Sequence, residues 1–405
     1  MATTFGVILV LLILSAQTVR CGSLPVFQQR VVPQSVFPGS GAGYSVAITP
    51  SGLRAVIASP FFSYGKNGSL SIYDRTGSTW KETAKLEEFY DASSYFFGVS
   101  VGIAQDGLTV VAGCPDCNHS TGSVFVFEQI GESWTGAISL DKEEPSGIFQ
   151  VGEAVAISQD GTTIACTASI DNTALVFVKK NGFWVRQDNH LTAPGVDTFA
   201  YSVALSGNGN FLLVGTSITP ADVLIFYKRN SSSMWYQSGP LIFDPNNLYG
   251  IASTIAMTAD GMFVVSASVA EGSASVFKLS ADETTYQVLQ QLSAPGSDIG
   301  YAYREIAISS LGEYIVIGDP SIYADTSYTK GGAFIFKLLN DRAGFKLVGN
   351  ITMPFFNATL SYKSGFGISV AVSDHGNFLI GASEENANTG KSLDARCLRL
   401  NHELT

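Results

Sequence analysis

A run of small residues, a tight glycine turn and a second apolar run recur together seven times along the chain. The clearest copy extends from Phe97 to Pro115 and reads FGVSVGIAQDGLTVVAGCP. When the copies are aligned on the turn glycine, the steps between them range from 48 to 64 residues. The seven turn glycines are Gly52, Gly107, Gly161, Gly209, Gly261, Gly312 and Gly376. A period of this size, with no helical pattern inside it, is typical of a β-propeller.

Each repeat contains four short β-like runs separated by turn signals. We therefore predict an all-β fold, a seven-bladed β-propeller of four-stranded antiparallel blades. The first run is rich in Gly, Ser, Ala and Val, which suits the crowded inner edge of a blade. The fourth run opens on an aromatic residue, and because these rings recur once per repeat we interpret them as packing residues. The blades are predicted to start near Gly43, Phe97, Val151, Ala200, Gly250, Ala302 and Phe366.

The two ends of the chain predict how the ring closes. Residues 27–33 resemble a fourth strand although no repeat precedes them, whereas the last repeat has no fourth strand of its own. We expect residues 26–33 to complete the last blade, because pairing the two ends removes the open sheet edges. Residues 384–405 depart from the repeat pattern, so the third strand of that blade is the least regular part of the prediction.

The N-terminus predicts export. An apolar run from Phe5 to Ala16 matches the core of a signal peptide, and Val19 and Cys21 suit its cleavage site. The segment before this run has no Lys or Arg, so a short signal anchor is the alternative. We predict a signal peptide over residues 1–21, followed by one propeller domain over residues 22–405. No later stretch is long and apolar enough to span a membrane, so we expect a secreted protein, soluble or associated with the cell surface.

The charge balance disfavours two classes of partner. The chain has 23 Lys and Arg against 34 Asp and Glu, a net charge of −11, and no basic cluster. Binding to phosphate backbones needs clustered cations. We therefore predict no nucleic-acid partner and no binding to an anionic membrane surface.

Cysteines and glycosylation triplets agree with export. Cys114 and Cys117 flank a Pro-Asp pair, and the chain lacks the second cysteine pair that a zinc site needs. We predict a local disulfide between them, and a small buried side chain at Cys166. Acceptor triplets for N-linked glycans begin at Asn67, Asn118, Asn230, Asn350 and Asn357. A surface rich in Ser and Asn without sugar is the alternative.

Over residues 26 to 400 the repeats resemble the FG-GAP family, known from the integrin α-subunit propeller. Phe97-Gly98 and Phe366-Gly367 match its opening pair, and Tyr44, Tyr201 and Tyr303 resemble conservative replacements of the Phe. The closing Ala-Pro step is represented by Ser59-Pro60, Cys114-Pro115 and Asp319-Pro320. The resemblance implies a propeller fold, and one fold hosts many functions.

Integrin-type repeats often bind calcium in the turn after the first strand, through several oxygen ligands. Here each turn offers at most one acidic residue, so we expect no metal and no cofactor. The four turn acids are Asp106, Asp160, Asp260 and Asp374. We interpret them as turn-forming residues.

The sequence contains no catalytic motif that we recognise. The predicted inner strands carry three charges, Glu153, Arg304 and Glu305. We interpret Arg304 and Glu305 as a structural ion pair, or as paired with neighbouring residues, rather than as an acid/base couple. We therefore predict that the protein is not an enzyme but a binding or adhesion module that recognises an extracellular protein or glycan. A hydrolase or lyase using the central channel is the alternative.

The longest predicted loops supply candidate ligand-binding residues. They fall between Asp319 and Gly331 and between Pro354 and Gly365. Aromatic side chains there can stack on sugar rings or anchor a protein partner. The alternative is that they pack the loops against the blades. The candidates are Tyr323, Asp325, Tyr328, Phe355, Phe356 and Tyr362.

Overall fold

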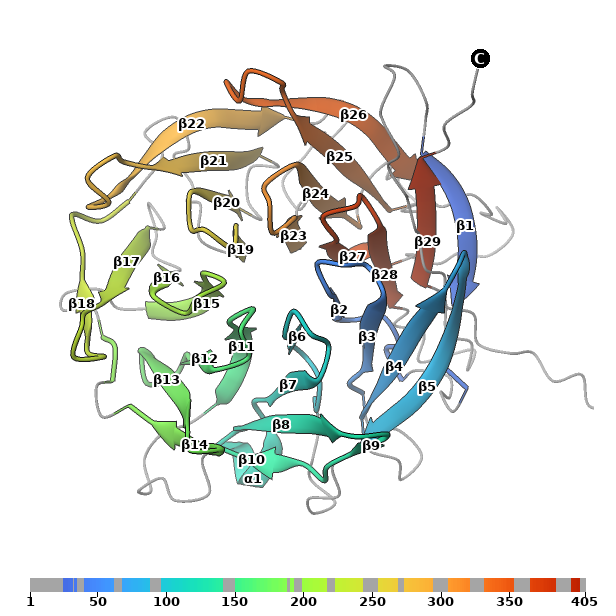
Figure 1. Ribbon diagram of the computed structural model, residues 1–405, viewed down its shortest axis with the longest axis horizontal. Coiled ribbons are helices and arrows are strands. Elements are labelled where there is room, and N and C mark those ends of the chain that lie inside the picture. The colour runs from blue at the N-terminus through green and yellow to red at the C-terminus, as the bar shows by residue number, and fades with distance from the viewer. Residues whose placement is uncertain are drawn as a thin grey trace, which may run out of the picture.

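The computed structural model describes fifteen stretches of the chain. They are residues 25–31, 33–34, 40–61, 68–87, 96–140, 150–187, 190–192, 199–216, 223–242, 254–268, 273–293, 305–320, 331–352, 365–383 and 395–400. Their strands form antiparallel sheets arranged around a central axis, as in a β-propeller (Figure 1). Among these residues no helix has the length and hydropathy needed to span a membrane.

The described strands form seven sheets, and in six of them the strands run from the axis outward in chain order. The first two are β2 (Val46–Ile48), β3 (Arg54–Ser59), β4 (Ser69–Thr76), β5 (Thr79–Glu87), and β6 (Val101–Ile103), β7 (Thr109–Cys114), β8 (Ser123–Ile130), β9 (Ser133–Trp134), β10 (Ile138–Ser139). The next two are β11 (Val151–Ile157), β12 (Thr163–Ala168), β13 (Thr173–Lys180), β14 (Phe183–Arg186), and β15 (Phe199–Leu205), β16 (Phe211–Thr216), β17 (Leu224–Arg229), β18 (Trp235–Gln237). They are followed by β19 (Thr254–Met257), β20 (Phe263–Ser268), β21 (Ser273–Leu279), β22 (Tyr286–Ser293), and β23 (Glu305–Ile308), β24 (Tyr314–Asp319), β25 (Gly332–Leu338), β26 (Phe345–Thr352).

The last sheet joins the two ends of the chain. It contains β27 (Gly365–Val372), β28 (Phe378–Ser383), β29 (Ala395–Leu400) and, outermost, β1 (Pro25–Val31). β29 occupies the third-strand place for which the sequence pattern was least regular, and β1 pairs along its length from Pro25↔Leu400 to Val31↔Ala395. The ring is therefore closed by a strand from the other end of the chain.

The prediction of four strands in every blade is wrong for one sheet. In the second sheet, both β9 and β10 pair with β8, so this sheet has five strands. Gln129↔Trp134 is a β9 pair, whereas Ile138↔Val126 and Ser139↔Phe125 are β10 pairs. The fourth strand is thus interrupted into two short pieces, and the fold-class prediction is corrected accordingly.

The core lies between neighbouring sheets rather than in one central mass. One cluster, for example, joins Ile72 and Leu70 of the first sheet to Phe125 and Phe127 of the second. The recurring aromatic residues of the fourth strands are part of this packing, since Trp80, Trp235 and Tyr286 are all buried.

The position of the opening Phe-Gly pair was wrongly assigned in two repeats. In the first repeat the residue equivalent to Phe97 is Ala42, and in the fourth repeat it is Phe199. Tyr44 and Tyr201 each lie two residues further along the chain. Val151 holds this position in the third repeat. The reason is that the left-handed backbone after this position, not an aromatic ring, defines the register. The left-handed residues are Gly43, Gly98, Gly152, Ala200 and Gly367. Tyr303 lies outside the described residues.

At Gly98 this backbone also brings the chain close to the preceding sheet. Its φ is 88°, and a Cβ there would lie 2.8 Å from Cδ2 of Leu70. Glycine meets both demands, because it has no side chain and adopts positive φ freely.

Candidate functional site: the channel end where the inner strands begin

The first strand of each sheet lies nearest the axis (Figure 1). These seven inner strands are β2, β6, β11, β15, β19, β23 and β27. We call the end of the propeller axis at which they begin the entrance end, and the end at which they turn into the second strands the turn end. The candidate site is the entrance end.

Serine hydroxyls join neighbouring inner strands near the entrance end. The Ser45 hydroxyl accepts a hydrogen bond from the backbone N–H of Val101 at 3.2 Å, and Ser100 accepts one from Val155 at 3.0 Å. Ser369 donates to a backbone carbonyl of the first sheet at 2.8 Å. All three serines lie seven residues before the turn glycine of their repeat, so this position holds adjacent sheets together.

Glu305 occupies the same repeat position in β23. Its half-buried side chain forms a hydrogen bond with Thr254, a buried residue of β19 in the preceding sheet. Burial raises the pKa of the Glu305 carboxyl to about 8, and this effect outweighs the hydrogen bond with Thr254, which lowers that pKa. Burial at this position thus favours the protonated form of the carboxyl. Arg304, its expected partner, lies outside the described residues.

Two further inner strands carry polar side chains in β-bulges at the entrance end. The pairing of β11 shifts register between Val151 and Val155, and Glu153 lies in that bulge. The Ser169 hydroxyl donates a hydrogen bond to the Glu153 carboxylate. Tyr201 lies in the corresponding bulge of β15 and its side chain is 45% exposed. Bulges re-aim side chains, and they are common next to functional sites.

Three aromatic rings pack together near the entrance end: Tyr44 and Phe96 precede the first two inner strands, and Phe61 follows β3. Tyr44 packs edge-to-face on Phe61 at 5.1 Å between ring centroids, and Phe61 packs on Phe96 at 5.7 Å. Phe96 is 37% exposed and has a φ of 68°, which is uncommon for a bulky residue. Backbone strain of this kind concentrates at functional sites, so we name Tyr44, Phe61 and Phe96 the aromatic cluster.

Backbone hydrogen bonds draw the sheets together at the turn end. The N–H of Gly207 donates to the carbonyl of Ala259 at 2.8 Å, and Ala259 donates to Ser310 at 2.9 Å. Asp374 of the last sheet donates to Pro50 of the first at 3.0 Å. Backbone groups of neighbouring sheets are thus joined directly at the turn end.

The acidic residues at the turn end stabilise their own turns. Asp106, Asp160 and Asp260 each accept a hydrogen bond from the backbone N–H two residues later, at 2.8, 3.0 and 2.9 Å. This is the turn-forming role predicted from the sequence. Asp374 differs, because its carboxylate accepts hydrogen bonds from the Ser310 hydroxyl and the Leu311 N–H of the neighbouring sheet.

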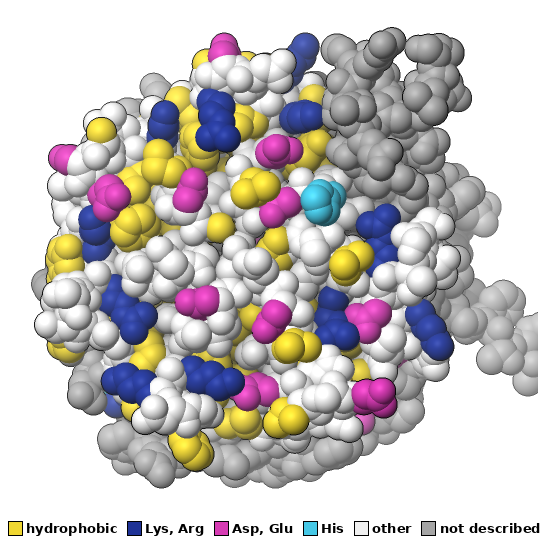
Figure 2. Space-filling model, in the orientation of Figure 1, with side chains coloured by type: hydrophobic (Ala, Val, Ile, Leu, Met, Phe, Trp, Pro, Cys, Tyr) yellow, Lys and Arg dark blue, Asp and Glu magenta, His cyan; other side chains and the backbone are white. Residues whose placement is uncertain are grey.

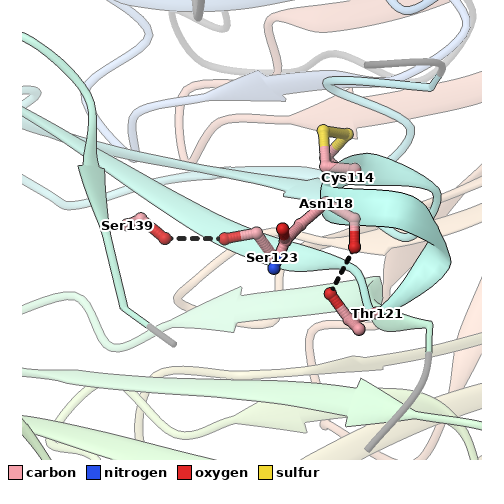
Figure 3. Close-up of a disulfide and its surroundings, with 6 residues drawn as sticks. Cys114, Asn118, Thr121, Ser123 and Ser139 are labelled. Carbon is pink, nitrogen blue, oxygen red and sulfur yellow. Dashed lines mark hydrogen bonds between the residues drawn. A yellow bond between two sulfur atoms is a disulfide. The ribbon is translucent and has the colours of Figure 1, made fainter. Parts of the chain in front are cut away.

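A disulfide joins Cys114 to Cys117, with their Cα atoms 5.4 Å apart (Figure 3). It encloses the start of the short helix α1 (Cys117–Ser120), where the Thr121 hydroxyl donates to the carbonyl of Asn118 at 2.8 Å. Cys166 is fully buried, in agreement with the sequence interpretation. The disulfide therefore fixes one loop between the second and third strands of a sheet.

The remaining predicted site residues divide into described and undescribed ones. All six candidate ligand-binding residues lie outside the described residues: Tyr323, Asp325, Tyr328, Phe355, Phe356 and Tyr362. Asn67 and Asn357 do too, whereas Asn118, Asn230 and Asn350 are exposed. On the face shown in Figure 2, Lys and Arg side chains are interspersed with Asp and Glu rather than gathered into one patch.

Comparison with known proteins supports the propeller fold and no particular family. No protein-family profile and no curated protein matches the chain, so the resemblance to FG-GAP repeats extends only to the fold. Among solved structures, the periplasmic gluconolactonase PpgL of Pseudomonas aeruginosa matches with a TM-score of 0.54 and 13% identity, covering 76% of this chain and 84% of that one. A 6-phosphogluconolactonase candidate from Bacteroides uniformis matches with a TM-score of 0.55 and 14% identity, covering 80% and 90%. The Cps50 (Swd1) β-propeller domain of Myceliophteria thermophila matches with a TM-score of 0.57 and 14% identity, covering 88% and 96%.

These matches overturn the prediction that the protein is not an enzyme. That prediction took a propeller without a recognised motif to be non-catalytic, yet proteins named as lactonases have this architecture. The structure adds a hydrogen bond between the half-buried Glu305 and Thr254, and the predicted ion pair with Arg304 stays a prediction because Arg304 lies outside the described residues. At such low identity the likeness shows the fold alone.

Proposed function

We propose that the protein hydrolyses a neutral, sugar-derived lactone or ester at the entrance end of the channel, with Glu305 as the proton donor. The observation that carries this proposal is the replacement of a structural serine by a half-buried carboxylic acid, hydrogen-bonded to Thr254, on an inner strand. A carboxyl that stays protonated near neutral pH can act as a general acid. The lactonase names of two structural relatives suggest the substrate class.

The charges of the inner strands favour a neutral substrate. Among the Asp, Glu, Lys and Arg residues, the seven inner strands contain two acids, Glu153 and Glu305. A phosphorylated sugar would be repelled by a carboxylate and needs cations to bind it. An unphosphorylated sugar lactone offers hydroxyl groups, which can donate hydrogen bonds to the Glu153 carboxylate.

The proposed reaction needs one proton donor and one water. Water adds to the lactone carbonyl carbon, and the bond between that carbon and the ring oxygen breaks. The Glu305 carboxyl donates its proton to the departing ring oxygen, which becomes a hydroxyl. The attacking water leaves one proton on the new carboxylic acid and supplies the other to restore Glu305.

The second candidate is recognition of an extracellular protein or glycan through the loops of the propeller face. The aromatic cluster favours it, because exposed rings such as Phe96 stack on sugars and anchor protein partners. Both functions would act outside the cytoplasm if residues 1–21 are a signal peptide. The Cys114–Cys117 disulfide supports that location, since disulfides persist mainly in oxidising compartments.

The test measures hydrolysis of glucono-δ-lactone, its 6-phosphate and p-nitrophenyl acetate above the spontaneous rates. The wild type is compared with Glu305→Gln and with Glu313→Gln, a matched control because Glu313 is an exposed acid of the same sheet at the turn end. We expect the wild type and Glu313→Gln to hydrolyse the neutral lactone and Glu305→Gln to lose at least about 100-fold of the rate. No turnover by the wild type would refute hydrolysis, and selective binding on a glycan or protein array would then support the second candidate.

A further inference from the structure

The hairpin between β17 and β18 presents one glycosylation triplet as an ordered, exposed turn. Asn230, Ser231 and Ser232 are all exposed. The backbone of Asn230 closes the turn by donating to the carbonyl of Met234 at 2.9 Å and accepting from the N–H of Ser233 at 2.9 Å. The triplet is therefore accessible without unfolding.

The side chain of Asn230 is held by its oxygen. Oδ1 accepts hydrogen bonds from the N–H groups of Ser232 and Met234, both at 2.9 Å. These two contacts orient the amide, and Nδ2 makes no hydrogen bond that would compete with an attached sugar among the residues that the structure describes. Nδ2 is the atom to which an N-linked glycan is attached.

The acceptors Asn118 and Asn350 are exposed too, but they lie in more constrained local structure. At Asn350 the middle residue of the triplet, Ile351, is buried in β26. Asn118 lies in α1 with a φ of 54°, beside the Cys114–Cys117 disulfide. Asn230 is thus the acceptor with the fewest structural restrictions among the three.

We propose that Asn230 carries an N-linked glycan. The hairpin lies at the turn end of the propeller, because the N–H of Arg229 donates to the carbonyl of Asn210, directly after the turn glycine Gly209, at 3.0 Å. A glycan on Asn230 leaves the entrance end open for a ligand. It also lies beside Met234 and Tyr236, whose side chains are 45% and 47% exposed, and adds polar surface next to them.

The test uses the full chain secreted from a eukaryotic host. Intact mass and peptide mapping are recorded before and after treatment with peptide N-glycosidase, for the wild type, Asn230→Gln, Ser232→Ala and Ser231→Ala. The last variant is the matched control, because it changes the same exposed turn but keeps the triplet. We expect the glycan at Asn230 in the wild type and in Ser231→Ala, and its loss in the other two variants. A secreted wild type with unmodified Asn230, or a wild type that is not secreted, overturns the proposal.

Discussion

Substitution of Gln29 by alanine tests how the ring is closed. The Gln29 amide in β1 accepts a hydrogen bond from the N–H of Trp80 at 2.8 Å and donates one to the carbonyl of Trp80 at 3.1 Å. This pair of bonds, which we call the glutamine clasp, joins the last sheet to the first. Each bond contributes about 1 kcal/mol, and the buried backbone groups of Trp80 would also lose their partners. We therefore expect Gln29→Ala to lower the free energy of unfolding by about 2–4 kcal/mol.

The chain supplies a matched control in the middle of the ring. Gln290 forms the same clasp with Phe345, at 2.9 and 2.6 Å, between the fifth and sixth sheets. Urea unfolding should show similar losses for Gln29→Ala and Gln290→Ala. Limited proteolysis should release the N-terminal strand only in Gln29→Ala, because only there does the clasp hold a chain end. A loss below about 0.5 kcal/mol for Gln29→Ala, beside a normal loss for Gln290→Ala, would refute the closure described here.

Three further predictions concern single sites. The Glu305 carboxyl has a pKa of about 8 in the folded chain against a usual value of 4.5, so its stabilising effect is complete below pH 4.5 and is lost as the pH rises to 8. At 1.36 kcal/mol per pH unit, the loss in the free energy of unfolding is at most about 5 kcal/mol. Urea unfolding at pH 5 and pH 9 should show this loss in the wild type but not in Glu305→Gln. Equal pH dependence of the two proteins would contradict the raised pKa of Glu305. Ala200 has a φ of 67°, so Ala200→Gly should raise stability by about 1 kcal/mol, whereas Ala204→Gly, in a regular part of the same strand, should lower it; a loss in both would contradict the strain argument. Removing the disulfide by Cys114→Ser with Cys117→Ser should cost about 2 kcal/mol for so short a loop, and dithiothreitol should reproduce this loss in the wild type but not in the variant.

The propeller architecture is readable from the sequence because its cause is local and repeated. Each copy carries the same turn chemistry, and glycine or Asn permits the backbone that a tight hairpin needs. The outer strand β1 is also recognisable, because residues 27–31 resemble the fourth strands of other repeats. The split of the second sheet into β9 and β10 was not predicted, although Gly136 lies between the two pieces, because a single glycine in a strand-like run does not show where the pairing is interrupted.

The register of the opening pair was mistaken for a physical reason. An aromatic side chain is an easy pattern to match, so Tyr44 and Tyr201 were aligned with Phe97. The structure requires instead a left-handed backbone one residue after the buried position, and Ala200 adopts it without being glycine. Because both glycine and alanine occupy this left-handed position, no single residue type marks it, and it is hard to recognise in one sequence.

The glutamine clasp and the acid at Glu305 were missed as site features although both leave sequence signals. Gln29, Gln187 and Gln290 each lie in or directly after an outer strand and each bond the next sheet. Glu305 was noticed as a channel charge, and alignment on the turn glycine places it where Ser45 and Ser100 stand. Its burial, which raises the pKa, comes from residues of other repeats and is visible only in the folded chain.

The pKa of Glu305 can be measured directly by carboxyl ¹³C NMR with labelled glutamate. The resonance is assigned by its absence in Glu305→Gln and followed from pH 4 to pH 10. The account predicts a carboxyl that titrates near pH 8. Titration near the usual pH 4.5 would contradict a protonated acid in the channel and, with it, the proposed hydrolysis.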